Sequence, residues 1–343
     1  MNINELCLRL KNYSGKELRI MEICGTHTAS IEKNGLKSLL SDKIRLVSGP
    51  GCPVCVTVSE YIDRLIELAA NKNNAVVSFG DMLRVPGSGG SLSSAKALGA
   101  DVRMVYSPFE MLALAKNEPQ KTFIFAAVGF ETTTPVYARL IQRAESENIL
   151  NIKILSSLKT MPAAVDLICS MGKTDGFIAP GHVCTVAGAH AFDSVAEKHG
   201  VPFAVSGFMP EEILASIYAL TLLHGTGKTV NLYKNAVKST PNFKAAELVG
   251  KYFEPCAASW RGFGEIQNSG LVLKKDFSHF DAGSRQNFKD SPQNSACICK
   301  KIICGDASPH ECPLFARACT PDFPCGACMV SHEGACFNSF IKE

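Results

Sequence analysis

Long apolar runs are missing from this sequence of 343 residues. No uninterrupted apolar stretch approaches the roughly 20 residues that a helix needs to cross a bilayer, so we expect no membrane association. Residues 1–19 mix Asn, Glu, Lys and Arg with short apolar pieces, and they lack the apolar segment and the cleavage site of a secretory signal. These absences predict a protein that stays in the cytoplasm.

An excess of charge is also missing, because the net charge is only +3 and the Lys and Arg residues are scattered singly. No basic patch with interleaved aromatic residues is present, so nucleic acid is not an expected partner. Residues 225–229 (GTGKT) resemble a phosphate-binding loop, but the pattern requires a glycine where the sequence has Leu222. We therefore predict no nucleotide site.

Cysteine, by contrast, is abundant, with 15 residues, eight of them within the last 47. In a reducing compartment such cysteines are metal ligands or redox groups more often than structural disulfides. Four of them form the pattern C-x14-C-x6-C-x16-C, namely Cys297, Cys312, Cys319 and Cys336. Four thiolates suit an iron–sulfur cluster or a zinc ion, and spacing alone does not choose among the eight. The four spaced cysteines lack the paired C-x2-C knuckles of structural zinc sites, which favours iron–sulfur.

Short β-branched runs alternate with amphipathic stretches between residues 44 and 206. Such near-continuous apolar strands predict parallel sheets that are covered on both faces. The expected strands are residues 44–48, 75–79, 102–106, 122–128, 152–156, 176–179 and 202–206. A chain of 343 residues is longer than the size at which a single hydrophobic core keeps growing. We therefore predict two Rossmann-like α/β domains, residues 1–118 and 119–238. A smaller cysteine-rich iron–sulfur domain would follow at 239–343.

The pair Cys52 and Cys55 forms a C-x2-C motif between an expected strand and an expected helix. Residues 57–60 (TVSE) have the pattern of a capping box that opens this helix. This placement resembles thioredoxin-type redox motifs, in which the helix end lowers one thiol pKa. The alternative is half of a zinc site, although no second C-x2-C or His pair lies nearby in sequence.

Cys24 and His27 follow the apolar run 18–23 and should emerge at the end of a strand. A lone cysteine there is usually a small buried residue, but the adjoining Gly, Thr and His favour a metal ligand or nucleophile. Glu131 lies in a similar position after the strand 122–128, where it would be an acid, a base or a cation ligand. The alternative there is a capped turn with Thr134 as N-cap.

Five motifs together resemble the HypD family of [NiFe]-hydrogenase maturation factors, and the likeness runs essentially from end to end. The motifs are residues 24–28 (CGTHT), 51–55 (GCPVC), 79–87 (FGDMLRVPG), 129–133 (GFETT) and 312–315 (CPLF). The chain departs from the family pattern at residues 231–233 (NLY) and by the additional Cys325. Cys328 also matches a family position, which leaves a substitution among the cluster ligands open.

The resemblance implies a scaffold, rather than a conventional turnover enzyme, that is monomeric alone and assembles the Fe(CN)2CO unit of the hydrogenase with the small chaperone HypC. HypE would deliver the cyanide. Cys24 would bind the iron, with His27 and Glu131 lining its site, and Cys52 and Cys55 would exchange electrons. The implied ligands of a [4Fe-4S] cluster are Cys297, Cys312, Cys319 and Cys336.

Two functions of other classes are alternatives to the function that the family resemblance implies. One is a thiol–disulfide oxidoreductase whose cysteine-rich tail binds structural zinc, and the other is a pure interaction module. Every hypothesis in which the cysteines carry out chemistry requires that sulfur atoms from distant parts of the chain meet in one crevice.

Overall fold

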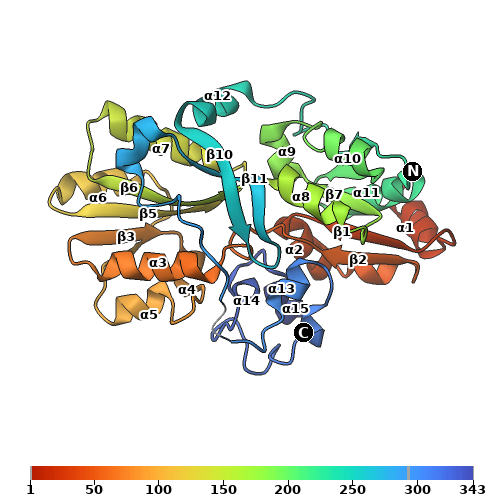
Figure 1. Cartoon of the computed structure of the whole chain (residues 1–343). Helices are drawn as coiled ribbons and strands as arrows, with labels where there is room; N and C mark the ends of the chain where they lie inside the picture. The colour runs from red at the N-terminus through yellow and green to blue at the C-terminus, as the bar shows by residue number, and fades with distance from the viewer. Residues whose placement is uncertain (1, 292–293, 343) are drawn as a thin grey trace.

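The structure is a computed structural model that describes residues 2–291 and 294–342. It contains two sheets, which lie side by side, and a cysteine-rich region below and between them (Figure 1). None of the helices in this described part of the chain combines the length and the apolar character that a membrane crossing demands.

The first sheet is wholly parallel, with strand order β2-β1-β7-β8-β9. Its strands are β1 Leu18–Glu22, β2 Ile44–Ser48, β7 Gly176–Pro180, β8 Phe203–Ser206 and β9 Thr229–Asn231. Residues along a strand alternate between the two faces. Ile20 packs into one buried cluster and Met21 into the other.

The second sheet is mixed, with strand order β10-β11-β6-β5-β3-β4. Four strands pair in parallel, namely β3 Asn74–Ser78, β4 Val102–Met104, β5 Thr122–Gly129 and β6 Ile152–Lys159. The antiparallel hairpin of β10 Phe253–Trp260 and β11 Gly264–Leu273 extends it beyond β6. The sequence did not predict this hairpin, because only parallel strands were expected.

Helices cover both faces of the sheets. Those before residue 150 are α1 Ile3–Lys11, α2 Gly25–Lys33, α3 Ser59–Ala70, α4 Gly80–Arg84, α5 Leu92–Ala97, α6 Glu110–Asn117 and α7 Thr134–Ser146. Those after it are α8 Met161–Ser170, α9 Gly181–Ala187, α10 Asp193–His199, α11 Pro210–Leu223 and α12 Phe243–Tyr252. Short 3-10 turns lie at η1 Leu36–Leu39 and η2 Lys275–Phe280. The α/β class is thus confirmed.

The predicted strands agree with the observed ones to within a few residues, because both sides of each central strand are buried. In β5, Phe123 and Phe125 face one apolar cluster, while Ile124 and Ala126 face the other. A strand buried on both faces needs apolar residues at consecutive positions, and this is the pattern that the sequence displays.

Two helix starts differ from the predicted ones. The capping box at residues 57–60 does not form, because the Thr57 hydroxyl donates to the Pro53 carbonyl and Glu60 accepts from the Lys289 amide. Thr134 is the first residue of α7 rather than its N-cap, and its hydroxyl donates to the Phe130 carbonyl at 3.0 Å. In each case another part of the fold provides the hydrogen-bond partner that local sequence did not show.

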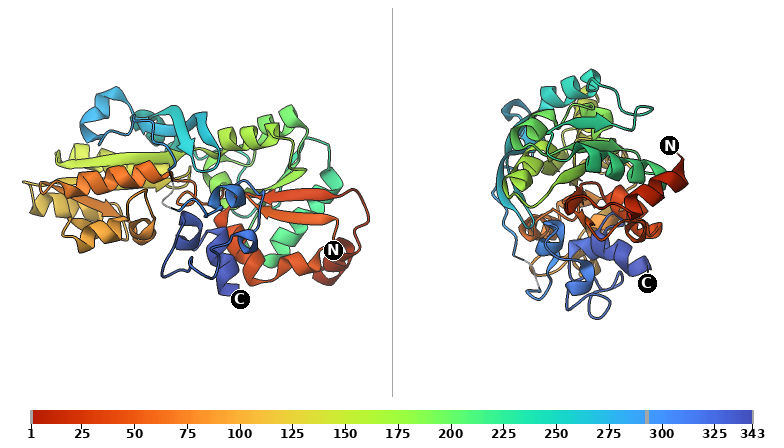
Figure 2. Two further views of the ribbon diagram at one scale, coloured as in Figure 1. Left: turned by 60° about the horizontal axis from the view of Figure 1, so that its bottom comes forward. Right: turned by 90° about the vertical axis from the view of Figure 1, so that its right-hand side faces the viewer.

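The two sheets interleave along the chain. Each takes strands from both sides of residue 118, and the hairpin of the second sheet comes from beyond residue 239. Neither sheet therefore coincides with the predicted ranges 1–118 and 119–238. The cysteine-rich segment contains α13 Cys299–Ile303, η3 Pro309–Glu311, α14 Ala327–Val330 and α15 Ala335–Lys342. Its last helix, α15, packs against α2 (Figure 2).

Candidate functional site

Cys24 and the C-x2-C motif meet because they follow neighbouring strands. Cys24 comes after β1 and occupies the N-cap position of α2, while Cys52 and Cys55 come after β2, which pairs with β1. The two loops touch directly, since the Gly25 amide donates to the Gly51 carbonyl at 3.1 Å. Carboxyl ends of adjacent parallel strands share one sheet edge, so the fold brings these thiols together.

The Cys24 thiol is buried, with 6% of the residue exposed. Burial raises its pKa to about 12, and the nearby Glu333 carboxyl adds to the rise, while the backbone amides of Thr26 and His27 oppose it. Without a bound cation the thiol is therefore protonated. A thiolate at this position requires a compensating positive charge, as a metal ion provides.

Two carboxyl groups that the sequence reading passed over lie beside Cys24. Glu22 is buried in β1 and accepts a hydrogen bond from the Cys24 amide at 3.2 Å, and burial raises its pKa to about 8. Glu333, from the loop between α14 and α15, accepts from the Thr26 hydroxyl at 3.4 Å. The sequence signal for Glu22 was its charge within the mainly apolar run 18–23, because the positions of a buried strand are normally apolar.

His27 is completely buried, and one of its ring nitrogens has no hydrogen-bond partner in the part of the chain that the structure describes. Its Nε2 lies 2.9 Å from the Gly207 carbonyl oxygen, so Nε2 carries the proton and Nδ1 keeps its lone pair. Nδ1 has no hydrogen-bond partner among the described residues. Burial lowers the pKa of His27 to about 4, and its ring packs 4.9 Å from that of Phe208. The ring is thus neutral and can accept a bond at Nδ1.

Glu131, like His27, has a buried polar atom without a hydrogen-bond partner among the described residues. Its Oε1 accepts from the Met161 amide at 2.8 Å, whereas its buried Oε2 has no partner in the described residues. Burial raises its pKa to about 7. The fully buried Cys184 on α9, a residue the sequence reading did not single out, links the two parts of the site. Besides burial, the charges of Glu131 and Cys24 both raise the pKa of Cys184, so both lie within its electrostatic range.

The dithiol itself is buried, with Cys52 4% and Cys55 3% exposed. The two lie together, because the Cys55 amide is 3.2 Å from the Cys52 Sγ. The predicted lowering of a thiol pKa is wrong for Cys55, whose pKa is raised well above its ordinary value by burial and by the thiols of Cys328 and Cys52. The helix α3 begins only at Ser59, so its N-terminus does not offset this burial.

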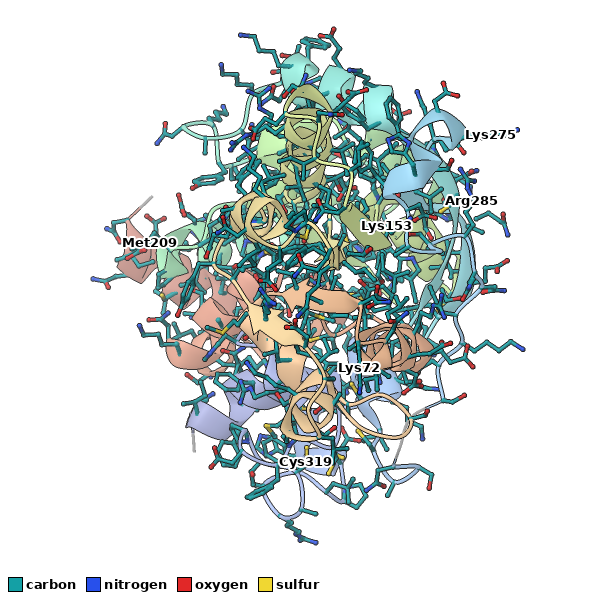
Figure 3. The ribbon with its side chains drawn as sticks, turned by 90° about the vertical axis from the view of Figure 1, so that its left-hand side faces the viewer. Lys72, Lys153, Met209, Lys275, Arg285 and Cys319 are labelled. Carbon is teal, nitrogen blue, oxygen red and sulfur yellow. The ribbon has the colours of Figure 1, made fainter. Side chains whose placement is uncertain are left out.

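The four predicted cluster cysteines line one small apolar cavity of about 10 Å³. Two further cysteines, Cys299 and Cys328, also line it, and their sulfur atoms are 2.7 Å apart. Figure 3 shows Cys319 in this region. The donors are all sulfur and the other walls are apolar, which fits an iron–sulfur cluster and equally a zinc ion. Within residues 2–291 and 294–342, no three potential ligands already form a metal site.

Sulfur contacts run from the dithiol to this cavity. The thiol of Cys55 contacts that of Cys328, which in turn contacts those of Cys299 and Cys336. Cys328 was expected only as a possible substitute among the cluster ligands, and Cys299 is a functional candidate that the sequence did not single out. The sequence signal for Cys299 was the surplus of tail cysteines over the four that one cluster needs.

Comparisons with known proteins place this chain in a family. The family model described as "HypD: Hydrogenase formation hypA family" matches residues 2–342. The chain belongs to the HypD family. It is 40% identical over 334 residues to the hydrogenase maturation factor HypD of Azotobacter vinelandii, covering 94% of this chain and 88% of that protein. The HypD of Escherichia coli K12 is 37% identical over 351 residues, covering 98% of this chain and 92% of that protein.

The HypD family comprises hydrogenase maturation factors, so this part of the sequence-based prediction is confirmed. Its HypD relative in Cupriavidus necator is 38% identical over 343 residues, covering 96% of this chain and 90% of that protein. The cysteine-rich region fits the iron–sulfur or metal binding that the sequence predicted. The roles of the individual residues stay predictions.

Proposed function

We propose that this chain is the scaffold on which, together with HypC, the Fe(CN)2CO unit of [NiFe]-hydrogenase is assembled. The iron is the cargo, and Cys24 binds it together with a cysteine of HypC. HypE supplies the cyanide, and Cys52 and Cys55 supply the electrons. The observation that carries this proposal is the direct packing of the Cys24 loop on the dithiol loop, with sulfur contacts leading onward to the cysteine-rich cavity.

The iron site is proposed from three groups around Cys24. His27 Nδ1 and Glu131 Oε2 are buried and have no hydrogen-bond partner among residues 2–291 and 294–342. A buried polar atom without a partner is costly unless a ligand provides one. Cys184 lies in electrostatic range of Glu131 and Cys24. A ferrous ion would compensate the charge of a Cys24 thiolate and of an ionised Glu131, both of which burial otherwise disfavours.

The dithiol provides the electrons that release cyanide. A thiocyanate on a HypE cysteine needs two electrons to leave as CN⁻, which restores the HypE thiol. Oxidation of Cys52 and Cys55 to a disulfide supplies two electrons and two protons, of which one goes to the HypE sulfur and one to solvent or to CN⁻. The bond that breaks is S–CN, and the bond that forms is the Cys52–Cys55 disulfide.

The residues Cys297, Cys312, Cys319 and Cys336 would hold the [4Fe-4S] cluster. When bound there, it would supply the one-electron chemistry through which an external donor restores the dithiol. Cys328 lies between this cavity and Cys55, so it would keep the two redox groups in contact. The protein's own part is to bury these thiols away from water and to hold them adjacent.

The infrared CO and CN stretching bands of the anaerobic complex with HypC test this proposal. We expect Cys24→Ser to abolish the bands, because the iron loses its ligand from this chain. Cys7→Ser, on the half-buried Cys7 of α1, is the matched control and should keep them. Bands that persist in a folded Cys24→Ser protein contradict the assignment of Cys24.

A further inference from the structure

A second cavity borders the β10–β11 hairpin of the second sheet. It has a volume of about 250 Å³ and lies between the end of β6, the β10–β11 hairpin and residues 284–288. None of the residues assigned above to the iron, the dithiol or the cluster lines it. Its most unusual wall residue is Lys159, the last residue of β6, which is only 2% exposed.

The strand register explains why Lys159 reaches this cavity. Lys159 pairs with Gly270 of β11, which in turn pairs with Cys256 of β10. Paired residues on adjacent strands point to the same face, so Lys159 and Cys256 flank a position without a side chain. A Cβ at Gly270 would lie 3.0 Å from the Cys256 sulfur. An irregularity in the pairing between Cys256 and Ala258 interrupts the hairpin at the same place.

The Lys159 ammonium group has no carboxylate partner in the described part of the chain. Its hydrogen bond goes to the Ser157 hydroxyl at 2.8 Å, and its Nζ lies 5.8 Å from the centre of the Trp260 ring. Burial lowers its pKa to about 7. The other buried cation nearby, Arg261, is compensated, because it donates to the Thr57 carbonyl and lies 3.6 Å from Asp290. An uncompensated buried charge is costly.

Apart from serine hydroxyls, which both donate and accept, the other polar side chains of the cavity wall offer more donor groups than carboxylates. Arg285 lines it, although that guanidinium already contacts Glu254 and the Leu273 carbonyl. The Oδ1 of Asn287 accepts from the Ser259 hydroxyl, which turns the amide NH2 group of Asn287 toward other partners. One carboxylate, the exposed Glu265, also lines the cavity and accepts from Gln267. Such walls favour an anionic ligand.

We propose that this cavity binds a small oxyanion, a carboxylate or phosphate group, with Lys159 as its charge partner. The bound anion compensates the ammonium group that the fold otherwise buries alone. Lys159 is also next to the turn that holds Glu131, since the Met161 amide donates to Glu131. The proposal depends on neither iron nor partner proteins.

Thermal unfolding of the full-length protein, purified anaerobically, tests this inference. Sodium acetate and sodium phosphate are compared with sodium chloride at equal ionic strength and pH. At about ten times Kd we expect an oxyanion to raise Tm by about 2 °C, because it binds only the folded state. Stabilisation by acetate alone assigns a carboxylate, by phosphate alone a phosphate group, and by both a general oxyanion site. No stabilisation by either overturns the proposal.

The variant Lys159→Met tests whether Lys159 is the charge partner of the anion, and Lys153→Met is its matched control. Lys153 lies on the same face of the same strand, at its other end, where it donates to backbone carbonyls of residues 279 and 281; Figure 3 labels it together with Arg285. We expect the anion effect to vanish in Lys159→Met and to persist in Lys153→Met. An undiminished effect in Lys159→Met contradicts the assignment.

A second measurement uses the wild-type protein, in case Lys159→Met does not fold. Cys256 is half-buried and lines the same cavity. The anion that stabilises the protein should slow the alkylation of Cys256 by iodoacetamide at least twofold, as read by peptide mass spectrometry. Cys7, on α1, serves as the internal control and should react at an unchanged rate. An unchanged rate at Cys256 overturns the proposal.

Discussion

Gly51 lies so close to Cys24 that no larger residue fits between their backbones. A Cβ at residue 51 would be 2.3 Å from the Cys24 nitrogen and 2.6 Å from its Cα. Real carbon atoms do not approach backbone this closely. The contact joins the loop that precedes the dithiol to the loop that carries the proposed iron ligand, so the two sulfur sites hold one another in place.

Gly51→Ala should therefore separate the two loops. We expect it to destabilise the protein by about 1–3 kcal/mol, because backbone atoms must move to admit the methyl group. It should also weaken the infrared CO and CN bands of the complex with HypC. Gly250→Ala is the control, because a Cβ there meets nothing within 4 Å in α12, and it should stabilise by roughly 0.5–1 kcal/mol. Equal stability of the two variants in urea unfolding would contradict the steric argument.

The second prediction concerns the cysteine-rich cavity. Cys297→Ser should remove the brown absorbance of the anaerobic protein and lower its iron and sulfide content, because one of four thiolate ligands is lost. Cys304→Ser is the control, since Cys304 is half-buried but does not line the cavity. Zinc without iron or sulfide in the wild-type protein would instead support the oxidoreductase with a structural zinc tail.

The third prediction concerns the dithiol. Replacing either Cys52 or Cys55 by Ser should abolish hydrogenase maturation in a complementation assay, because a single thiol cannot supply two electrons by forming an internal disulfide. Cys169→Ser should be tolerated, since this buried thiol belongs to α8 and the charged groups that act on it are Asp166 and Lys198 rather than other thiols of the described residues. Full maturation by the double variant Cys52→Ser/Cys55→Ser would favour the pure interaction module.

The fourth prediction follows from the raised pKa of Glu131, which is about 7 in the folded protein against roughly 4.3 when unfolded. Between these values the folded state holds the proton and the unfolded state does not. The free energy of unfolding should thus fall as pH rises from 5 to 7.5, by about 2–3 kcal/mol for this group. Glu131→Gln should remove this loss in metal-free protein.

Denaturant unfolding at several pH values checks this sign. Gln can still accept from the Met161 amide, so the variant should differ from the wild type in pH dependence rather than in packing. Glu197→Gln, at an exposed position on α10, changes the charge equally and serves as control. A Glu131→Gln protein that loses as much stability with rising pH as the wild type would refute the buried carboxylate.

The sequence predicted the chemistry-bearing residues better than it predicted their electrostatics. The strand ends at Cys24, at the dithiol and at Glu131 were correctly placed, because near-continuous apolar runs mark strands buried on both faces. A lowered pKa was expected for one thiol of the dithiol, whereas the pKa of Cys55 is raised, because thiol ionisation depends on burial in the folded protein. Burial at a loop is set by whatever packs over it, here the cysteine-rich segment.

By itself the sequence determined the α/β class, most strand positions, the family and the set of candidate cysteines. These features depend on the local periodicity of apolar residues and on short sequence motifs. Only the tertiary structure decided that the two sheets interleave along the chain and that an antiparallel hairpin completes the second. It alone placed Cys299 and Cys328 in the cavity wall and brought Cys328 into contact with Cys55 of the dithiol. The physical reason is that strand pairing and sulfur contacts join residues hundreds of positions apart, whose proximity no local pattern encodes.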